Sequence, residues 1–288
     1  VARAIGRPAV VGAEGLKGDY STKTAVAGDV VIKEGDWVTI DEFTRNVYVG
    51  QVPTIEPKLP PEFYELLDMA DSVSVFGVKA NADTPEDATI ARRFGAKGIG
   101  LLRTERMFRA PGRLELFRSV ILSTNADARR DALNKLAELM RRDFEEIFEI
   151  MEGYPVTVRL FDPPLHEFLP NVEELVAEVT RARALGRPDT EKEALLARVK
   201  ALMEANPMMG HRGVRLGITF PDIYAAQVKA ILEAALELKK RGKNIQVQIM
   251  IPQVSEYKEL EYVINNVVKP TAEEVFKNYG DRIDFKVG

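Results

Sequence analysis

The sequence predicts an α/β fold with a parallel sheet, preceded by a smaller β-rich region. From Val73 onward, apolar segments with strand character alternate with amphipathic segments of helical period. Repeated β-then-α order is typical of both doubly wound sheets and (β/α)8 barrels, and the pattern alone leaves these two architectures open. Residues 1–52 instead hold short apolar runs between glycines, and residues 53–72 carry four of the 16 prolines. We therefore expect a β-rich region, a semi-rigid linker and an α/β domain at 73–288.

The elements follow in order from their periodicity and their turn residues. In the first region we expect strands at AVV, TAVAG, VVIKEGDWVTID and NVYVG. In the α/β region we expect strands at VSVFGVKAN, GIGLL, PVTVRLF and IQVQIMIP and the start of a further one at DFKVG, too few for a complete barrel of eight. Helices are expected after a cap at Thr84, over 126–152 and 171–206, in PDIYAAQVKAILEAALELKKRG, and on both sides of Pro270.

One strand of the α/β region has two chemically different faces. Val156, Val158 and Leu160 share one face of PVTVRLF, while Thr157 and Arg159 share the other. The strand IQVQIMIP repeats the contrast, with glutamines opposite isoleucine and valine. An apolar face that packs on helices and a polar face turned elsewhere fits a barrel whose interior is polar near one end.

Composition excludes several classes of protein. Apolar residues make up 45% and charged residues 29% of the 288 residues, an ordinary balance for a globular protein. The net charge of −4 and the absence of basic blocks argue against a nucleic-acid partner. The chain has no cysteine, no apolar run of about 18 residues and no N-terminal signal-peptide pattern. We therefore expect a cytoplasmic protein without a membrane segment.

Arginines stand where strands end. Arg103 follows the strand GIGLL, Arg159 lies near the end of PVTVRLF, and Arg212 belongs to the unusual stretch NPMMGHRGVRLGI. Chemistry in (β/α)8 barrels occurs at the carboxyl ends of the strands, and guanidinium groups match carboxylate or phosphate. An ordinary ion pair is the alternative, with Glu105, Asp162 and Glu167 as available partners. The pattern alone predicts an anion site on a parallel α/β scaffold.

Several motifs together resemble one enzyme family. NADTPEDA, GIGLLRTERMF, VRLFDPPLHEFLP and NPMMGHRGVRLGI, in this order and spacing, resemble the pyruvate, phosphate dikinases, which belong to the wider family of PEP-utilising enzymes. The resemblance implies that residues 73–288 form the first part of a (β/α)8 barrel that binds phosphoenolpyruvate and pyruvate. It also implies that Arg103, Arg159 and Arg212 bind the phosphate of phosphoenolpyruvate. Asp162 is expected to orient Arg159, and Glu105 to orient Arg103, unless both carboxylates are purely structural.

The resemblance extends to the N-terminal region and to the reaction. VARAIGRPAVVG and GDWVTIDEFTRNVYVG resemble the end of a swivelling phosphohistidine domain. In such enzymes a histidine is phosphorylated by ATP and phosphate, with release of AMP and pyrophosphate, and then phosphorylates the enolate of pyruvate. His166 and His211 belong to other motifs and are expected to be structural. Mg²⁺ is implied, as is a homo-oligomer, a dimer in the family.

Parts of the family's machinery are not found in this sequence. The phosphohistidine, the TMIE and GTND segments with the metal ligands, and the proton-donating cysteine are missing, and neither a Walker A spacing nor a G-x-G-x-x-G order occurs. We therefore expect no catalytic residue, no metal ligand and no dikinase activity in this chain alone. A truncated relative that binds phosphoenolpyruvate or a partner protein without catalysis is the alternative. Arg106, Gln248 and Gln253 depart from the family pattern, in which histidine, glutamate and leucine are usual.

Overall fold

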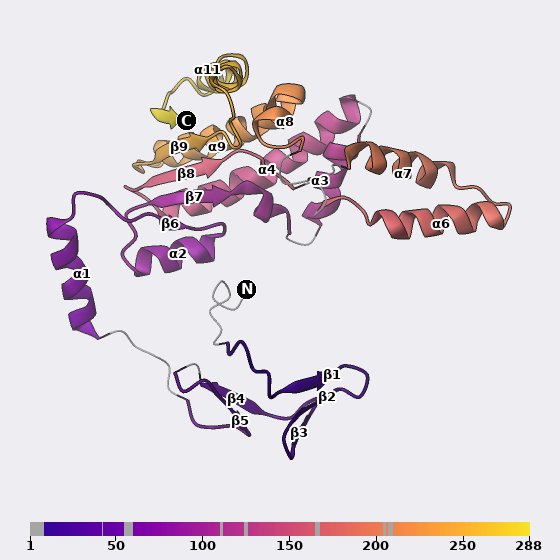
Figure 1. The fold of residues 1–288 in the computed structure, drawn as a ribbon. Coiled ribbons are helices and arrows are strands. Elements are labelled where there is room, and N and C mark those ends of the chain that lie inside the picture. The colour runs from indigo at the N-terminus through magenta and orange to yellow at the C-terminus, as the bar shows by residue number, and fades with distance from the viewer. Residues whose placement is uncertain are drawn as a thin grey trace. The chain divides into compact units, whose positions relative to one another are not determined.

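The computed structural model describes residues 9–41, 43–54, 60–109, 112–123, 126–164, 168–203, 206 and 210–288. Their contacts divide the chain into two compact units, Val1–Leu66 and Leu67–Gly288, with the division inside helix α1 (Pro61–Val73) (Figure 1). This helix occupies the second half of the segment expected to be a proline-rich linker, and it buries none of its side chains.

The N-terminal unit holds two small antiparallel sheets. Strands β1 (Lys17–Asp19), β2 (Thr24–Ala27) and β3 (Val30–Lys33) form a meander, and β4 (Val38–Asp41) pairs with β5 (Asn46–Val49). Gly28 adopts a φ of 58° in the tight turn between β2 and β3, a conformation that glycine accepts without strain. Strands β2 to β5 confirm the predicted runs. The prediction at AVV is wrong, since residues 9–11 form no strand, and β1 was not predicted.

The second unit is built on a parallel sheet of five strands. These are β6 (Ala80–Asn81), β7 (Ile99–Arg103), β8 (Pro155–Arg159), β9 (Gln246–Met250) and β10 (Phe285–Val287). Each strand pairs with the next one in the chain, so the spatial order is β6-β7-β8-β9-β10. The order never reverses, so this sheet lacks the switch point of a doubly wound sheet. DFKVG provides the fifth strand, and the described residues contain no sixth.

Four helices connect these strands and pack on one face of the sheet (Figure 1). They are α2 (Pro85–Arg93), α4 (Ala126–Ile150), α9 (Pro221–Lys240) and α11 (Lys269–Tyr279). Each helix contacts the next one in strand order, which places all four on the same side. Thr84 caps α2 as predicted, because its Oγ1 accepts a hydrogen bond from the Asp87 amide at 3.1 Å. A π-helical turn, η3 (Ile264–Val268), joins α10 (Tyr257–Val263) to α11 and accommodates Pro270.

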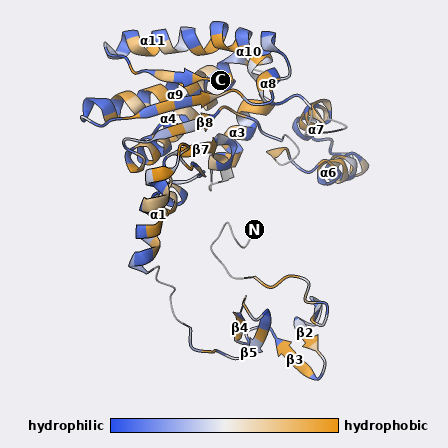
Figure 2. Ribbon diagram, turned by 60° about the vertical axis from the view of Figure 1, so that its left-hand side comes forward, coloured by the Kyte–Doolittle hydropathy of each residue, from blue (hydrophilic) through white to orange (hydrophobic). Residues whose placement is uncertain are grey.

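The core lies between the sheet and these helices. Val156, Val158 and Leu160 are fully buried in it, as are Val247 and Ile249 of β9. The apolar strand face therefore packs on the helices, as predicted, and Thr157 and Arg159 point to the opposite side. Figure 2 shows that much of the α9 ribbon is hydrophobic (orange), and eleven of its residues are buried.

The predicted strand VSVFGVKAN is largely wrong. Only Ala80–Asn81 is a strand, while Val75 and Phe76 are 90% and 85% exposed. Backbone hydrogen bonding to the segment that leads into β7 begins only at Val78, whose carbonyl accepts a hydrogen bond from the Lys97 amide. An apolar, β-branched run predicts a strand, but a strand also needs a neighbour to pair with.

Three short helical elements were not predicted from the sequence, whereas the pair of helices expected over 171–206 was. The unpredicted elements are the 3₁₀ helix η2 (Thr104–Arg109), α3 (Arg113–Leu122) and α8 (Val214–Thr219). The helices expected over 171–206 are present as α6 (Val172–Ala184) and α7 (Thr190–Leu202). Both η2 and the segment before α8 carry charged residues of the candidate site.

Candidate anion site

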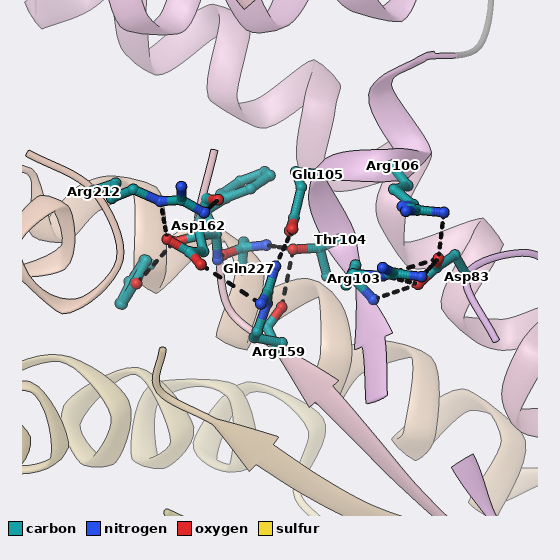
Figure 3. A network of polar contacts seen from close by, with 11 residues as sticks. Asp83, Arg103, Thr104, Glu105, Arg106, Arg159, Asp162, Arg212 and Gln227 are labelled. Carbon is teal, nitrogen blue, oxygen red and sulfur yellow. Dashed lines mark hydrogen bonds and ion pairs between the residues drawn. The ribbon is translucent and has the colours of Figure 1, made fainter. Parts of the chain in front are cut away.

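The sheet brings two of the predicted arginines to the same edge. Arg103 and Arg159 are the last residues of β7 and β8, and they are direct partners in the register of these parallel strands. Arg212 joins Arg159 through the shared carboxylate of Asp162, while Arg103 and Arg106 share Asp83, so the guanidinium groups lie in two neighbouring clusters of polar contacts (Figure 3). This is the edge at which α/β enzymes place their chemistry.

Asp83 holds Arg103 in place. The Asp83 carboxylate accepts from the Arg103 amide at 2.8 Å, from Nη2 at 2.7 Å and from Nε at 3.1 and 3.2 Å. Arg106 adds a longer contact at 3.4 Å. Asp83 is only 5% exposed, whereas 27% of the Arg103 side chain remains exposed. Asp83 was not among the predicted site residues, although it stands two residues beyond β6, at the same end of the sheet as Arg103.

Arg159 lies between two carboxylates. Its Nη2 donates to Glu105 Oε1, and its Nη1 lies 3.5 Å from Asp162 Oδ2. The expected contact of Asp162 with Arg159 is therefore present. The expected contact of Glu105 with Arg103 is not, because η2 begins directly after β7 and directs Glu105 toward the neighbouring strand β8.

Asp162 also binds Arg212. Its Oδ1 accepts from Arg212 Nε at 2.5 Å, and its main-chain carbonyl accepts from Nη2 at 2.8 Å. Both side chains are almost completely buried. A buried pair of this kind is held by charge-assisted hydrogen bonds and fixes the orientation of the guanidinium plane.

Burial raises the pKa of Glu105 above its ordinary value of 4.5, even though Arg159 opposes that shift. Among the described residues, Glu105 Oε2 and Arg159 Nε are buried without a hydrogen-bond partner. Buried polar atoms are normally paired, so these two mark the least satisfied point of the network. The ion pair between Glu105 and Arg159 is accordingly the part of the site that a competing anion could replace most readily.

A second layer of neutral hydrogen bonds lies behind the charged groups. Thr104 Oγ1 donates to the Arg159 carbonyl at 2.9 Å and accepts from Gln227 Nε2 at 3.0 Å. Gln227 Oε1 accepts from the Phe161 amide at 2.8 Å, and the Tyr224 hydroxyl donates to the Phe161 carbonyl at 2.9 Å. Burial raises the pKa of Tyr224 well above its ordinary value, which keeps the hydroxyl protonated as a donor.

The residues that depart from the family pattern lie at different places. Arg106 joins the site through Asp83. Gln248 lies in the middle of β9, where its Oε1 accepts from Thr157 Oγ1 at 2.8 Å and from Lys79 Nζ at 3.2 Å. Gln253 adopts a φ of 61° and accepts from Arg215 Nη2 at 3.3 Å.

The structure describes only one of the two histidines, His211. His211 Nε2 lies 2.6 Å from Thr219 Oγ1, a contact consistent with the structural role expected of it. His166 and Glu167 lie outside the described residues.

The charges of the site favour an anion. Four guanidinium groups, from Arg103, Arg106, Arg159 and Arg212, face the three carboxylates of Asp83, Glu105 and Asp162. Among the described residues, no group of three or more His, Cys, Asp or Glu side chains is placed to hold a metal ion. In the same part of the chain, no helix is both long and apolar enough to cross a membrane.

Comparison with known proteins finds one matching family and several similar enzymes. Residues 61–288 match the family described as PEP-utilising enzyme, PEP-binding domain. The chain is 47% identical over 291 residues to pyruvate, phosphate dikinase of Entamoeba histolytica, 44% over 288 residues to that of Giardia intestinalis and 41% over 289 residues to that of Clostridium symbiosum. These similarities cover the whole chain but only 33%, 32% and 32% of the relatives, so the chain spans about a third of their length.

The family match and the identities confirm the resemblance that the motifs indicated. The family match includes the whole α/β unit, which carries the arginines at its strand ends. The chain therefore belongs to the family of PEP-utilising enzymes.

Proposed function

We propose that this chain is the phosphoenolpyruvate-binding part of a pyruvate, phosphate dikinase. Such an enzyme interconverts ATP, phosphate and pyruvate with AMP, pyrophosphate and phosphoenolpyruvate through a phosphohistidine. The proposal is supported by identities above 40% to dikinases from three distant organisms over the whole chain. Because the chain spans a third of these relatives, the complete reaction is proposed for the enzyme and not for the chain alone.

Arg103, Arg159 and Arg212 are proposed to hold the phosphate of phosphoenolpyruvate. The observation that carries this assignment is the register of Arg103 beside Arg159 at the ends of adjacent parallel strands. A phosphoryl group in transfer spreads its negative charge over three oxygens, and cations fixed around it lower the barrier. The carboxylates behind the arginines fix them before the ligand arrives, which reduces the entropy lost on binding.

The finer architecture is part of the same proposal. A sequential strand order with all crossover helices on one face supports an incomplete (β/α)8 barrel. Residues 1–52 are proposed to be the end of the swivelling phosphohistidine domain. Mg²⁺ is proposed to be a cofactor of the complete enzyme, a cytoplasmic homo-oligomer, although the described residues of this chain form no cluster of ligands for it.

Calorimetric titration of the chain with phosphoenolpyruvate tests the anion site. We expect weak binding, and we expect Arg159→Ala to reduce the affinity roughly 10- to 150-fold, since a hydrogen bond to a charged group contributes about 1.5–3 kcal/mol. Arg142→Ala is the matched control, because Arg142 pairs with Glu138 on the exposed surface of α4 and should leave the affinity unchanged. Equal affinities of the Arg159→Ala variant and the unmodified chain would place the anion elsewhere.

A turnover assay tests the remaining part of the proposal. The chain is incubated with ATP, phosphate, pyruvate and magnesium, and the products AMP and phosphoenolpyruvate are measured. We expect no turnover above a denatured control, because groups that act as a unit lose nearly all of the rate when most of them are removed. Sustained formation of both products would contradict this expectation.

A further inference from the structure

The helix α9 presents two polar side chains to the backbone beside the anion site. Tyr224 and Gln227 lie three residues apart, on the same buried face of this helix, and both are fully buried. Gln227 accepts a hydrogen bond from the Phe161 amide, and Tyr224 donates one to the Phe161 carbonyl. Both polar groups of this one residue are therefore held by α9, and Phe161 stands between Arg159 and Asp162.

Gln227 also reaches the other strand of the site. Its Nε2 donates to Thr104 Oγ1, whose hydroxyl in turn donates to the Arg159 carbonyl. Thr104 directly follows Arg103 and precedes Glu105, and it is fully buried. One amide side chain thus connects the backbone that carries Arg103 and Glu105 with the backbone that carries Arg159 and Asp162 (Figure 3).

A buried glutamine in this place needs an explanation. Glutamine is mostly exposed in folded proteins, and a buried amide is costly unless its hydrogen bonds are made. Here the carbonyl oxygen and the amide nitrogen each have a partner, and both partners belong to segments that carry the site. The side chain of Phe161 is held separately, by Phe108 at 4.7 Å and Phe117 at 5.5 Å between ring centroids. Packing therefore anchors the ring, while the amide of Gln227 sets the path of the backbone.

We propose that Gln227 is a positioning residue of the anion site, which sets the spacing between the Arg103–Glu105 segment and the Arg159–Asp162 segment. This inference rests on the proposed function, because it assigns Gln227 to the binding of the same phosphate group. Gln227 touches no ligand in this scheme and acts through Thr104 and Phe161. A shift of about 1 Å in such a frame is enough to weaken binding or catalysis by up to about 100-fold.

The test compares three variants of the whole chain by calorimetry with phosphoenolpyruvate and with inorganic phosphate. Gln227→Met keeps the length and bulk of the side chain but removes both hydrogen bonds, and we expect it to lower the affinity roughly 10- to 100-fold. Val228→Ala removes buried volume from the neighbouring, fully buried position of α9 and is the control for lost stability. Its unfolding midpoint should fall while its affinity stays unchanged.

A double-mutant cycle separates positioning from a merely structural role. If Gln227 positions Arg159, the affinity lost through Arg159→Ala should be much smaller in the Gln227→Met background than in the unmodified chain. The same loss in both backgrounds, with the affinity of Gln227→Met itself unchanged, would overturn the inference. Thr104→Val breaks the same connection from its other end, so it gives the same test if Gln227→Met does not fold.

The outcomes for the inference and for the proposed function are distinct. Absence of phosphoenolpyruvate binding by the unmodified chain would reject the proposed function and, with it, any positioning role toward that ligand. Binding that is lost in Arg159→Ala but retained in both Gln227→Met and Thr104→Val would support the function and reject the inference alone.

Discussion

The two units of this chain both contain strands, yet they differ in what those strands bury. In the α/β unit, the inward positions of β7, β8 and β9 are almost completely buried against α4 and α9. In the N-terminal unit, Val31, Trp37 and Val49 are 52%, 68% and 57% exposed. Every buried apolar side chain of the described residues belongs to the second unit, and in Figure 2 β3 is hydrophobic (orange) without being buried.

The difference shows that a strand pattern and a core are separate properties. The runs that became β2 to β5 predict strands correctly, because β-branched residues and turn glycines specify local structure, whereas AVV forms no strand. Small two- and three-stranded sheets bury too little apolar surface to be stable alone. The parallel sheet gains its stability from helices that cover one face. We therefore expect the cooperative unfolding of the chain to report the α/β unit.

The largest effect that separates the two units should come from truncating one aromatic residue in each. Phe144 is completely buried in α4 and stacks on Phe148 at 6.0 Å, so Phe144→Ala should lower the free energy of unfolding by about 3–5 kcal/mol. Trp37→Ala should change it by less than about 0.5 kcal/mol, because Trp37 is mostly exposed. Urea unfolding followed by circular dichroism of the helices measures both.

Equal losses in these two variants would mean that the N-terminal unit contributes to the core after all. Trp37 is the only tryptophan of the chain, so its fluorescence in the Phe144→Ala variant provides an independent reading of the N-terminal unit. An unchanged fluorescence transition beside a shifted helical transition would show that the two units unfold independently.

Replacing one glycine in each unit should give a smaller difference in the free energy of unfolding. A Cβ at Gly217 in α8 would lie 2.4 Å from two atoms of the Tyr224 ring, which is fully buried and can move away only by displacing its neighbours. Gly217→Ala should therefore lower the free energy of unfolding by about 1–3 kcal/mol through overpacking. At Gly15, in the N-terminal unit, nothing lies within 4 Å of the added Cβ. Gly15→Ala should cause no loss of stability.

The Gly217 variant also tests the connection between packing and the site. Displacement of the Tyr224 ring would move its hydroxyl away from the Phe161 carbonyl. Gly217→Ala should then weaken phosphoenolpyruvate binding as well as stability. Loss of stability at unchanged affinity would show that the Tyr224 hydrogen bond does not shape the site.

The site itself was only partly predictable from the sequence. Arg103 and Arg159 follow from local rules, since each ends an apolar strand and parallel strands end at one edge. The same rule could have found Asp83. The partner of Glu105 could not be predicted, because the 3₁₀ turn after β7 decides which strand the carboxylate faces. Gln227 is 123 positions from Thr104, and nothing in a helix of alanine and leucine marks one glutamine as a hydrogen-bonding partner of a distant strand end.

The fold was predictable to a similar extent and for the same reason. Helices with long periodic faces and clear caps were found, because their signals are local. VSVFGVKAN was misjudged because strand pairing depends on a neighbour, and the choice between a doubly wound sheet and a barrel was open because strand order is not written in any one strand. The order of the strands follows only from the pairing of β6 to β10 in the structure.

The smallest predicted effect is a difference in pH dependence between two glutamates of the α/β unit. Burial raises the pKa of Glu105, whereas the amides of Ser255 and Glu256 lower the pKa of Glu259 at the start of α10. A carboxyl with a raised pKa binds more protons in the folded state, so the ionised Glu105 reduces stability as the pH rises above 4.5 through its raised pKa. The ionised Glu259 adds stability above 4.5, and that stability is lost as the pH falls through its lowered pKa.

The two amide variants should therefore change in opposite directions between about pH 4 and pH 8. Relative to the unmodified chain, Glu105→Gln should become more stable as the pH rises, by at most about 1.4 kcal/mol per pH unit, and Glu259→Gln should become less stable. Urea unfolding of the three proteins at several pH values provides the comparison, with Glu259→Gln as the control of opposite sign. Equal slopes for Glu105→Gln and the unmodified chain would mean that the attraction to Arg159 compensates fully for the burial of Glu105.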